Sequence, residues 1–189
     1  MKKFLTLFSV TFIFILVLSM PVYASSYKTV TNAKTKYGSS YVWRPTNTAF
    51  KVQYSGSTYT VSKPVYTLGG VTNGSILYYS SLKSKYAGKV TIYKYNIKTG
   101  KEQKIGTVKK ALHIKGLYNN CLYGNGAKSD GSASDMVYKY NLSTKKKSTV
   151  LNNFWIEKAS GKYLYGTRNG VKYKYNISTK KLTKYNWSN

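Results

Sequence analysis

Three short segments of the chain place tyrosine and lysine at alternate positions. The sequence Tyr-Lys-Tyr-Asn occurs at residues 93–96, 138–141 and 173–176. A period of two is that of a β-strand, in which successive side chains point to opposite faces of a sheet. The pattern therefore predicts strands with tyrosines on one face and lysines on the other. After residue 24, apolar residues do not recur at the spacing of three and four that indicates a helix.

Each of these strands ends in an asparagine that leads into a similar turn. The turns read Ile-Lys-Thr-Gly-Lys, Leu-Ser-Thr-Lys-Lys and Ile-Ser-Thr-Lys-Lys. Asparagine can hydrogen-bond to the backbone ahead of it and so start a turn, and Gly100 stands where a short hairpin needs a left-handed residue. Lys145 and Lys180 occupy that position in the other two copies. If the geometry is shared, each lysine carries a strain of about 1 kcal/mol.

Two further elements recur before the tyrosine–lysine strands. One reads Ile-Leu-Tyr-Tyr, Cys-Leu-Tyr-Gly and Tyr-Leu-Tyr-Gly and begins at Ile76, Cys121 and Tyr163. The other is an apolar stretch around Ile114 and Ile156. A degenerate early copy of the unit covers residues 41–54. Because a fixed period indicates a repeat architecture, we expect an N-terminal segment at 25–40 and a repeat domain at 41–189, with repeats near 41–70, 71–116, 117–158 and 159–189.

Short antiparallel strands that recur in this way are typical of the blades of a β-propeller. The run from Leu77 to Ile105 resembles the blade repeat of bacterial secreted β-propellers. It is most similar to the family named after the low-density-lipoprotein-receptor-related propeller domain, and more distantly to TolB-type propellers. The resemblance covers residues 40–187 and implies a binding or interaction scaffold. We therefore expect an all-β fold of about four blades that form a small, open or incomplete propeller, with an extended β-meander as the alternative.

The first 24 residues have the pattern of a secretory signal peptide. Lys2 and Lys3 precede an apolar run from residue 4 to residue 20, and Pro21 is followed by a small-residue cleavage site that ends at Ala24. The remainder is expected to be secreted from a bacterial cell and to be extracellular, either free or associated with the cell surface. An uncleaved membrane anchor is the alternative, because the apolar run could nearly span a bilayer.

The chain is strongly basic. It has 31 lysines and arginines against four aspartates and glutamates, a formal net charge of +27. Without residues 1–24 the counts are 29 and four, which leaves +25. Such a charge attracts polyanions, so we expect a non-enzymatic protein that binds anionic wall polymers or acidic polysaccharide. A protein–protein scaffold or self-association is one alternative, and binding to nucleic acid is a less favoured one. A further interpretation is that the lysines only keep the protein soluble.

Few side chains are of the kinds that catalysis or metal binding needs. The carboxylates are Glu102, Asp130, Asp135 and Glu157, and the chain has one histidine, His113, and one cysteine, Cys121. Proton transfer and glycoside hydrolysis need positioned pairs of such groups, which this spacing does not indicate. Residues 130–135 lack the alternating carboxylates and closing glutamate of a calcium loop. We therefore expect no enzyme activity, no cofactor and no metal site, with His113 and Cys121 as structural residues of strands.

Aromatic rings beside lysines remain as candidates for ligand binding. Such rings can hold sugar rings or bases. In the third copy the stretch between two strands is shorter, and Arg168 and Lys172 flank it, where they could meet an acidic ligand. Tyrosines at every second position are also expected to pack the core, so each ring has two possible roles. The candidate residues are Tyr78, Tyr79, Tyr123, Trp155, Tyr165, Arg168 and Lys172, together with Trp43.

Overall fold

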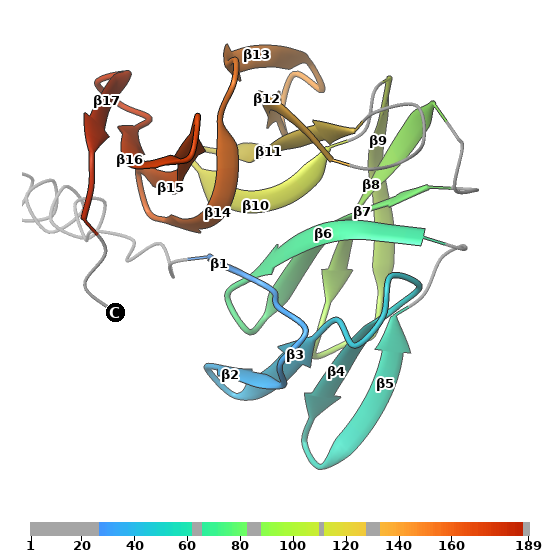
Figure 1. The fold of residues 1–189 in the computed structure, drawn as a ribbon. Coiled ribbons are helices and arrows are strands. Elements are labelled where there is room, and N and C mark those ends of the chain that lie inside the picture. The colour runs from blue at the N-terminus through green and yellow to red at the C-terminus, as the bar shows by residue number, and fades with distance from the viewer. Residues whose placement is uncertain (1–26, 62–65, 83–87, 110–111, 128–132, 187–189) are drawn as a thin grey trace, which may run out of the picture.

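A computed structural model describes residues 27–61, 66–82, 88–109, 112–127 and 133–186 of the chain. All the secondary-structure elements assigned within these residues are β-strands (Figure 1). The all-β class predicted from the period of two is therefore confirmed. The signal-peptide segment and residues 130–132 lie outside the described residues, whereas residues 133–135 begin a strand.

The seventeen described strands form four antiparallel sheets, and sixteen of them make up four blades of four consecutive strands each. Blade 1 contains β2 (Thr35–Tyr37), β3 (Ser40–Trp43), β4 (Phe50–Tyr54) and β5 (Ser57–Val61). Blade 2 contains β6 (Tyr66–Thr72), β7 (Ile76–Leu82), β8 (Lys89–Asn96) and β9 (Glu102–Lys109). Blade 3 contains β10 (His113–Tyr118), β11 (Cys121–Ala127), β12 (Ala133–Asn141) and β13 (Lys147–Leu151). Blade 4 contains β14 (Trp155–Ser160), β15 (Tyr163–Arg168), β16 (Val171–Asn176) and β17 (Lys181–Lys184).

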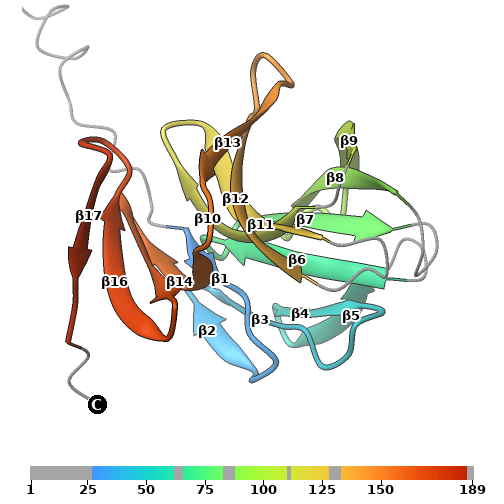
Figure 2. The ribbon, with the colours of Figure 1, turned by 45° about the horizontal axis from the view of Figure 1, so that its top comes forward.

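The four blades form an open propeller-like arrangement. Neighbouring blades pack face to face, and their first strands β6, β10 and β14 lie side by side at the centre (Figures 1 and 2). The ring is not closed between blade 4 and blade 1. An open propeller of four blades is thus confirmed, and the extended meander is wrong. Three of the expected repeat limits, at residues 71, 117 and 159, fall within these first strands, which carry the least regular sequence motif.

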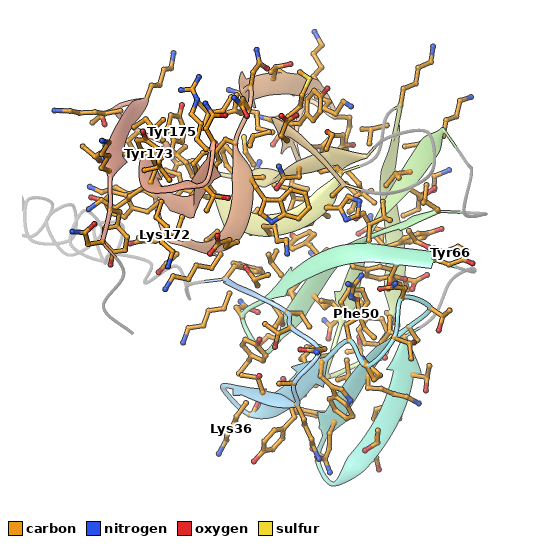
Figure 3. All side chains as sticks on the ribbon, in the orientation of Figure 1. Lys36, Phe50, Tyr66, Lys172, Tyr173 and Tyr175 are labelled. Atoms are coloured by element: carbon orange, nitrogen blue, oxygen red, sulfur yellow. The ribbon has the colours of Figure 1, made fainter. Side chains whose placement is uncertain are left out.

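Apolar clusters join each blade to the next. Tyr95 belongs to the cluster between blades 1 and 2, Tyr140 to the one between blades 2 and 3, and Tyr175 to the one between blades 3 and 4. These rings are only 8%, 0% and 4% exposed. Each is the second tyrosine of a Tyr-Lys-Tyr strand, so the tyrosine face of blades 2, 3 and 4 packs against the preceding blade (Figure 3, where Tyr173 and Tyr175 are labelled).

The N-terminal segment runs through the centre of the arrangement. β1 (Lys28–Thr29) pairs with β6 of blade 2, and the Val30 amide donates to the Gly70 carbonyl at 2.9 Å. The Thr29 hydroxyl donates to the carbonyl of Lys115 in blade 3. The Arg44 amide of blade 1 donates to the Thr31 carbonyl at 2.8 Å. Residues expected only as an N-terminal segment therefore tie three blades together.

The asparagine turns have the geometry that the sequence predicts. Asn96, Asn141 and Asn176 each accept hydrogen bonds from backbone amides two or three residues ahead. Gly100 has a φ of 66°, and Lys145 and Lys180 have φ values of 57° and 56°. Both lysines are thus held in the left-handed region, which L-residues adopt only at an energetic cost.

Replacing Lys145 by glycine is expected to stabilise the protein. The substitution removes the strain of the left-handed conformation, which is about 1–2 kcal/mol. Glycine also raises the conformational entropy of the unfolded chain, which lowers the stability by about 0.4–1 kcal/mol. The free energy of unfolding is therefore expected to rise by about 0.5–1 kcal/mol. Urea unfolding of K145G measures it. K146G, one residue away and outside the left-handed region, is the matched control and is expected to destabilise. A K145G protein less stable than the parent would contradict the prediction.

The raised pKa values of partly or fully buried tyrosines predict that stability falls in alkali. Burial, followed by the nearby Cys121, Tyr175 and Tyr118, raises the pKa of Tyr123 to about 12. Burial, and then the nearby Tyr78, raises the pKa of Tyr27 to about 12 as well. Unfolded tyrosine ionises near pH 10.0. Between these values the unfolded chain has lost protons that the folded chain keeps, so stability falls as pH rises.

Replacing Tyr123 by phenylalanine is expected to flatten this alkaline loss of stability. The free energy of unfolding, measured by urea titration followed by circular dichroism at several pH values between 9 and 12, checks it. The parent is expected to lose stability progressively above pH 10, and Y123F more gradually. Y59F removes a hydroxyl from an exposed ring and serves as the control. Identical slopes for Y123F and the parent would overturn the assignment.

Candidate anion-binding cleft

A β-bulge lies at a corresponding place in the first strands of blades 2, 3 and 4. Each bulge leaves one residue outside the pairing, namely Leu68, Lys115 and Glu157. A bulge redirects the side chain of its extra residue. Leu68 packs into the core between blades 2 and 3, whereas Lys115 and Glu157 line an open cleft.

The glycine of the Leu-Tyr-Gly motif makes room for two of these bulges. A Cβ on Gly124 would lie 2.1 Å from the carbonyl oxygen of His113, and a Cβ on Gly166 would lie 1.9 Å from that of Trp155. No side chain fits at such distances, so both positions need glycine. The motif that marks the repeats thus also sets the backbone that presents Lys115 and Glu157.

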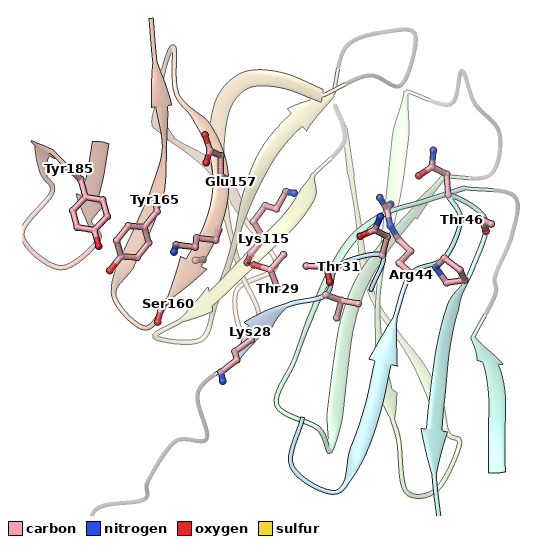
Figure 4. Close-up of a pocket in the computed structure, with 16 residues that line it drawn as sticks. Lys28, Thr29, Thr31, Arg44, Thr46, Lys115, Glu157, Ser160, Tyr165 and Tyr185 are labelled. Atoms are coloured by element: carbon pink, nitrogen blue, oxygen red, sulfur yellow. Dashed lines mark hydrogen bonds between the residues drawn. The ribbon is translucent and has the colours of Figure 1, made fainter. Parts of the chain in front are cut away.

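The cleft has a volume of about 890 Å³ and lies on the open side of the propeller. Figure 4 shows Tyr165 and Tyr185 of blade 4 on one side of it and Arg44 and Thr46 of blade 1 on the other, with Thr29 between them. The cleft is therefore formed by both ends of the row of blades, with the N-terminal segment between.

Positive charge dominates the lining. The lining contains four cations, Lys28, Arg44, Lys115 and Lys158, and one carboxylate, Glu157. Burial lowers the pKa of the Arg44 guanidinium, which also donates to the Thr67 carbonyl at 2.7 Å. Burial, and then the charge of Arg44, lowers the pKa of the Lys115 ammonium. An anion placed beside Lys115 would favour its charged form again, so anion binding and protonation of Lys115 are linked.

Tyrosines and lysines cover the sheet face of blade 4 beside the cleft. The rings of Tyr165 and Tyr185 meet edge to face with centroids 5.2 Å apart, and those of Tyr163 and Tyr165 are 6.2 Å apart. The Lys174 ammonium lies 5.1 Å from the Tyr163 centroid and 5.4 Å from that of Tyr185. Burial, and then Tyr185 and Tyr163, raises the pKa of Tyr165.

The structure divides the candidate residues predicted from the sequence. Tyr165 lines the cleft, and Lys172 lines a smaller hollow of about 430 Å³ beside Tyr185. Trp155 is 41% exposed, and Arg168 is exposed at the end of β15. All four residues lie in blade 4, but only Tyr165 lines the cleft.

Three of the predicted tyrosines serve packing instead. Tyr79 is fully buried, and its hydroxyl donates to Glu102. Tyr123 is 4% exposed between blades 3 and 4, and Tyr78 is half-buried against Tyr27. Tyr79 and Tyr123 therefore have the packing role that was the other expectation for these tyrosines, and a neighbouring blade covers each ring. Trp43 is half-buried under the Lys34 ammonium, 5.3 Å from its ring.

Sequence reasoning missed three of the cations that line the cleft. Lys28, Arg44 and Lys115 belong to three different elements, and only the packing of the blades brings them together. A bulge leaves no clear trace in a single sequence, so nothing marked Lys115 apart from other lysines. Within the described residues, no group of three His, Cys, Asp or Glu side chains could hold a metal ion. In that same part of the chain, no helix is long and apolar enough to cross a membrane.

The fold is similar to solved structures of longer proteins. TolB from Acinetobacter baumannii superposes with a TM-score of 0.51 at 15% identity, over 91% of this chain and 44% of TolB. The tricorn protease gives 0.49 at 12%, over 85% and 16%. A putative 6-phosphogluconolactonase from Bacteroides uniformis gives 0.42 at 16%, over 88% and 56%. This chain thus spans less than half of TolB.

No protein-family model matches the chain, and no curated protein sequence matches it. The similar structures include enzymes as well as TolB, and all have low sequence identity to this chain. The likeness to TolB concerns the path of the backbone and does not extend to an activity. It shows that the chain has a β-propeller-like fold.

Proposed function

We propose that this chain is an exported, non-enzymatic binding protein that associates through its cleft with anionic polymers of a bacterial cell surface or wall. The observation that carries the proposal is the convergence of four cations on one cleft with a single carboxylate. The signal-peptide pattern of the first 24 residues supports an extracellular location. We also propose kinship with the secreted propellers that the repeat sequence resembles, which would make the chain a binding scaffold.

The electrostatics of the cleft favour a charged polymer over a neutral one. Lys115 and Arg44 are partly withdrawn from water, so neither is fully compensated by solvent. An anion that enters would replace the lost hydration and gain from the lower effective dielectric of the site. The net charge of +27 for the whole chain adds a long-range attraction that steers any polyanion toward it.

Binding of a purified anionic wall polymer tests the proposal. The protein without residues 1–24 is expected to bind the immobilised polymer, with an affinity that falls steeply as salt rises because counterions are released on binding. A neutral polysaccharide of similar length is expected not to bind. Surface plasmon resonance over a series of salt concentrations measures both.

Paired charge variants locate the binding. The double variant K28Q/K158Q removes two cations from the cleft and is expected to lower the affinity about tenfold, or about 1.4 kcal/mol. K98Q/K101Q removes the same charge from exposed positions next to the turn between β8 and β9 and is expected to change it less than threefold. Equal losses in both variants would mean that the charge acts without a site, and absence of binding at low salt would refute the proposal.

Two alternatives give different results in the same experiment. If the chain binds nucleic acid, double-stranded DNA at equal phosphate concentration would displace the wall polymer fully. If it is a protein–protein scaffold, neither polymer would bind in a way that depends on Lys28 and Lys158. Competition between DNA and wall polymer therefore separates the three.

A further inference from the structure

Each blade from the second onward pairs a tyrosine with a lysine on the sheet face that is turned toward the next blade, here called the forward face. The cross-strand pairs are Tyr78 with Lys94, Tyr123 with Lys139, and Tyr165 with Lys174. In blade 3 the next blade covers this face, and Tyr123 is 4% exposed in the cluster with Phe154. The forward face is therefore built to be covered.

Blade 4 has the same forward face but no described blade follows it. Its rings are half-buried, and two of them, Tyr165 and Tyr185, line the cleft, which shows that the face is open to a ligand. Three ammonium groups lie above the rings of Tyr163 and Tyr165, each between 5.1 and 5.6 Å from a centroid. They belong to Lys158, Lys162 and Lys174.

We propose that the forward face of blade 4 holds the sugar rings of an acidic polysaccharide, an inference that rests on the proposed function. Tyr163 and Tyr185 are the rings on which the sugars stack. Lys162 and Lys174 pair with the acid groups of the polysaccharide. Tyrosine presents an apolar ring and a hydroxyl that can hydrogen-bond. A ligand that uses rings and ammonium groups spaced about 5 Å apart needs flat carbon faces and anionic groups in one monomer. A uronic-acid sugar offers both, whereas a polyphosphate offers only charge.

The charges on the face argue against a second copy of this chain as the occupant. The other sheet face that no blade covers, on blade 1, carries Tyr41 and Trp43, and the Lys34 ammonium lies 5.2 and 5.3 Å from their rings. Docking blade 4 of one molecule on blade 1 of another would bring two lysine-bearing faces together. Like charges at an interface are unfavourable, and each chain carries a net charge of +27.

Three probes of matched length separate sugar recognition from charge. They are an oligogalacturonate, which has rings and carboxylates, a linear polyphosphate, which has charge without rings, and a neutral oligosaccharide. Isothermal titration calorimetry is expected to show the oligogalacturonate binding about tenfold more tightly than the polyphosphate per charge. The neutral oligosaccharide is expected to bind too weakly to measure.

Ring variants assign the preference to this face. Y163L and Y185L are each expected to lower the oligogalacturonate affinity about tenfold while changing the polyphosphate affinity less than twofold. Y59A removes an exposed ring from β5 of blade 1 and is expected to change neither. Circular dichroism confirms that each variant is folded. Should a variant fail to fold, protection of Tyr163 and Tyr185 from nitration by bound oligogalacturonate in the parent protein gives an independent measure.

The outcomes distinguish failure of this inference from failure of the proposed function. The ring variants could lose affinity for both anionic probes equally, or bound oligogalacturonate could protect neither tyrosine from nitration. Either result would show that the face adds no sugar recognition, although the cleft still binds polyanions. If the parent binds no anionic probe, both proposals fail. Sedimentation of Y163L and the parent checks whether a second copy of the chain occupies the face instead. A dimer of the parent that Y163L abolishes would show that the face binds another copy.

Discussion

The packing of one tyrosine face against the preceding blade is the contact on which the rest of the structure depends. Tyr95, Tyr140 and Tyr175 each fill the space between two sheets, and they come from the same position of the repeat. A four-stranded sheet buries only part of its surface by itself, so each blade is stable because its neighbour covers it. With no possible disulfide in a chain with a single cysteine, these contacts carry the stability.

A row of blades that does not close has two consequences for the site. The first strands meet at the centre without a complete ring, and the N-terminal segment lies there, hydrogen-bonded to blades 1, 2 and 3. Blade 4 keeps a forward face that no described blade covers. The cleft and the tyrosine–lysine face of blade 4 are therefore continuous, since Tyr165 and Tyr185 belong to both.

The same residue type has opposite roles in this molecule according to what covers it. Tyr123 and Tyr165 occupy matching positions of the Leu-Tyr-Gly motif, yet one is in the core and the other lines the cleft. Lysine behaves similarly. Lys98 lies in a solvated turn, whereas Lys115 is presented by a bulge to a partly desolvated centre where its pKa is lowered. The cleft of the proposed function thus includes Lys115 and Glu157, which stand where a bulge interrupts the strand pairing.

The sequence by itself determined the strands, the turns and the blades, because these depend on local periodicity and on the backbone preferences of asparagine, glycine and lysine. It predicted the left-handed φ of Lys145 and the tyrosine–lysine alternation. Only the tertiary structure decided which tyrosines are buried, since exposure depends on whether another blade follows. It also placed Lys28, Arg44 and Lys115 in one cleft, because residues far apart in the chain meet there only when the blades pack.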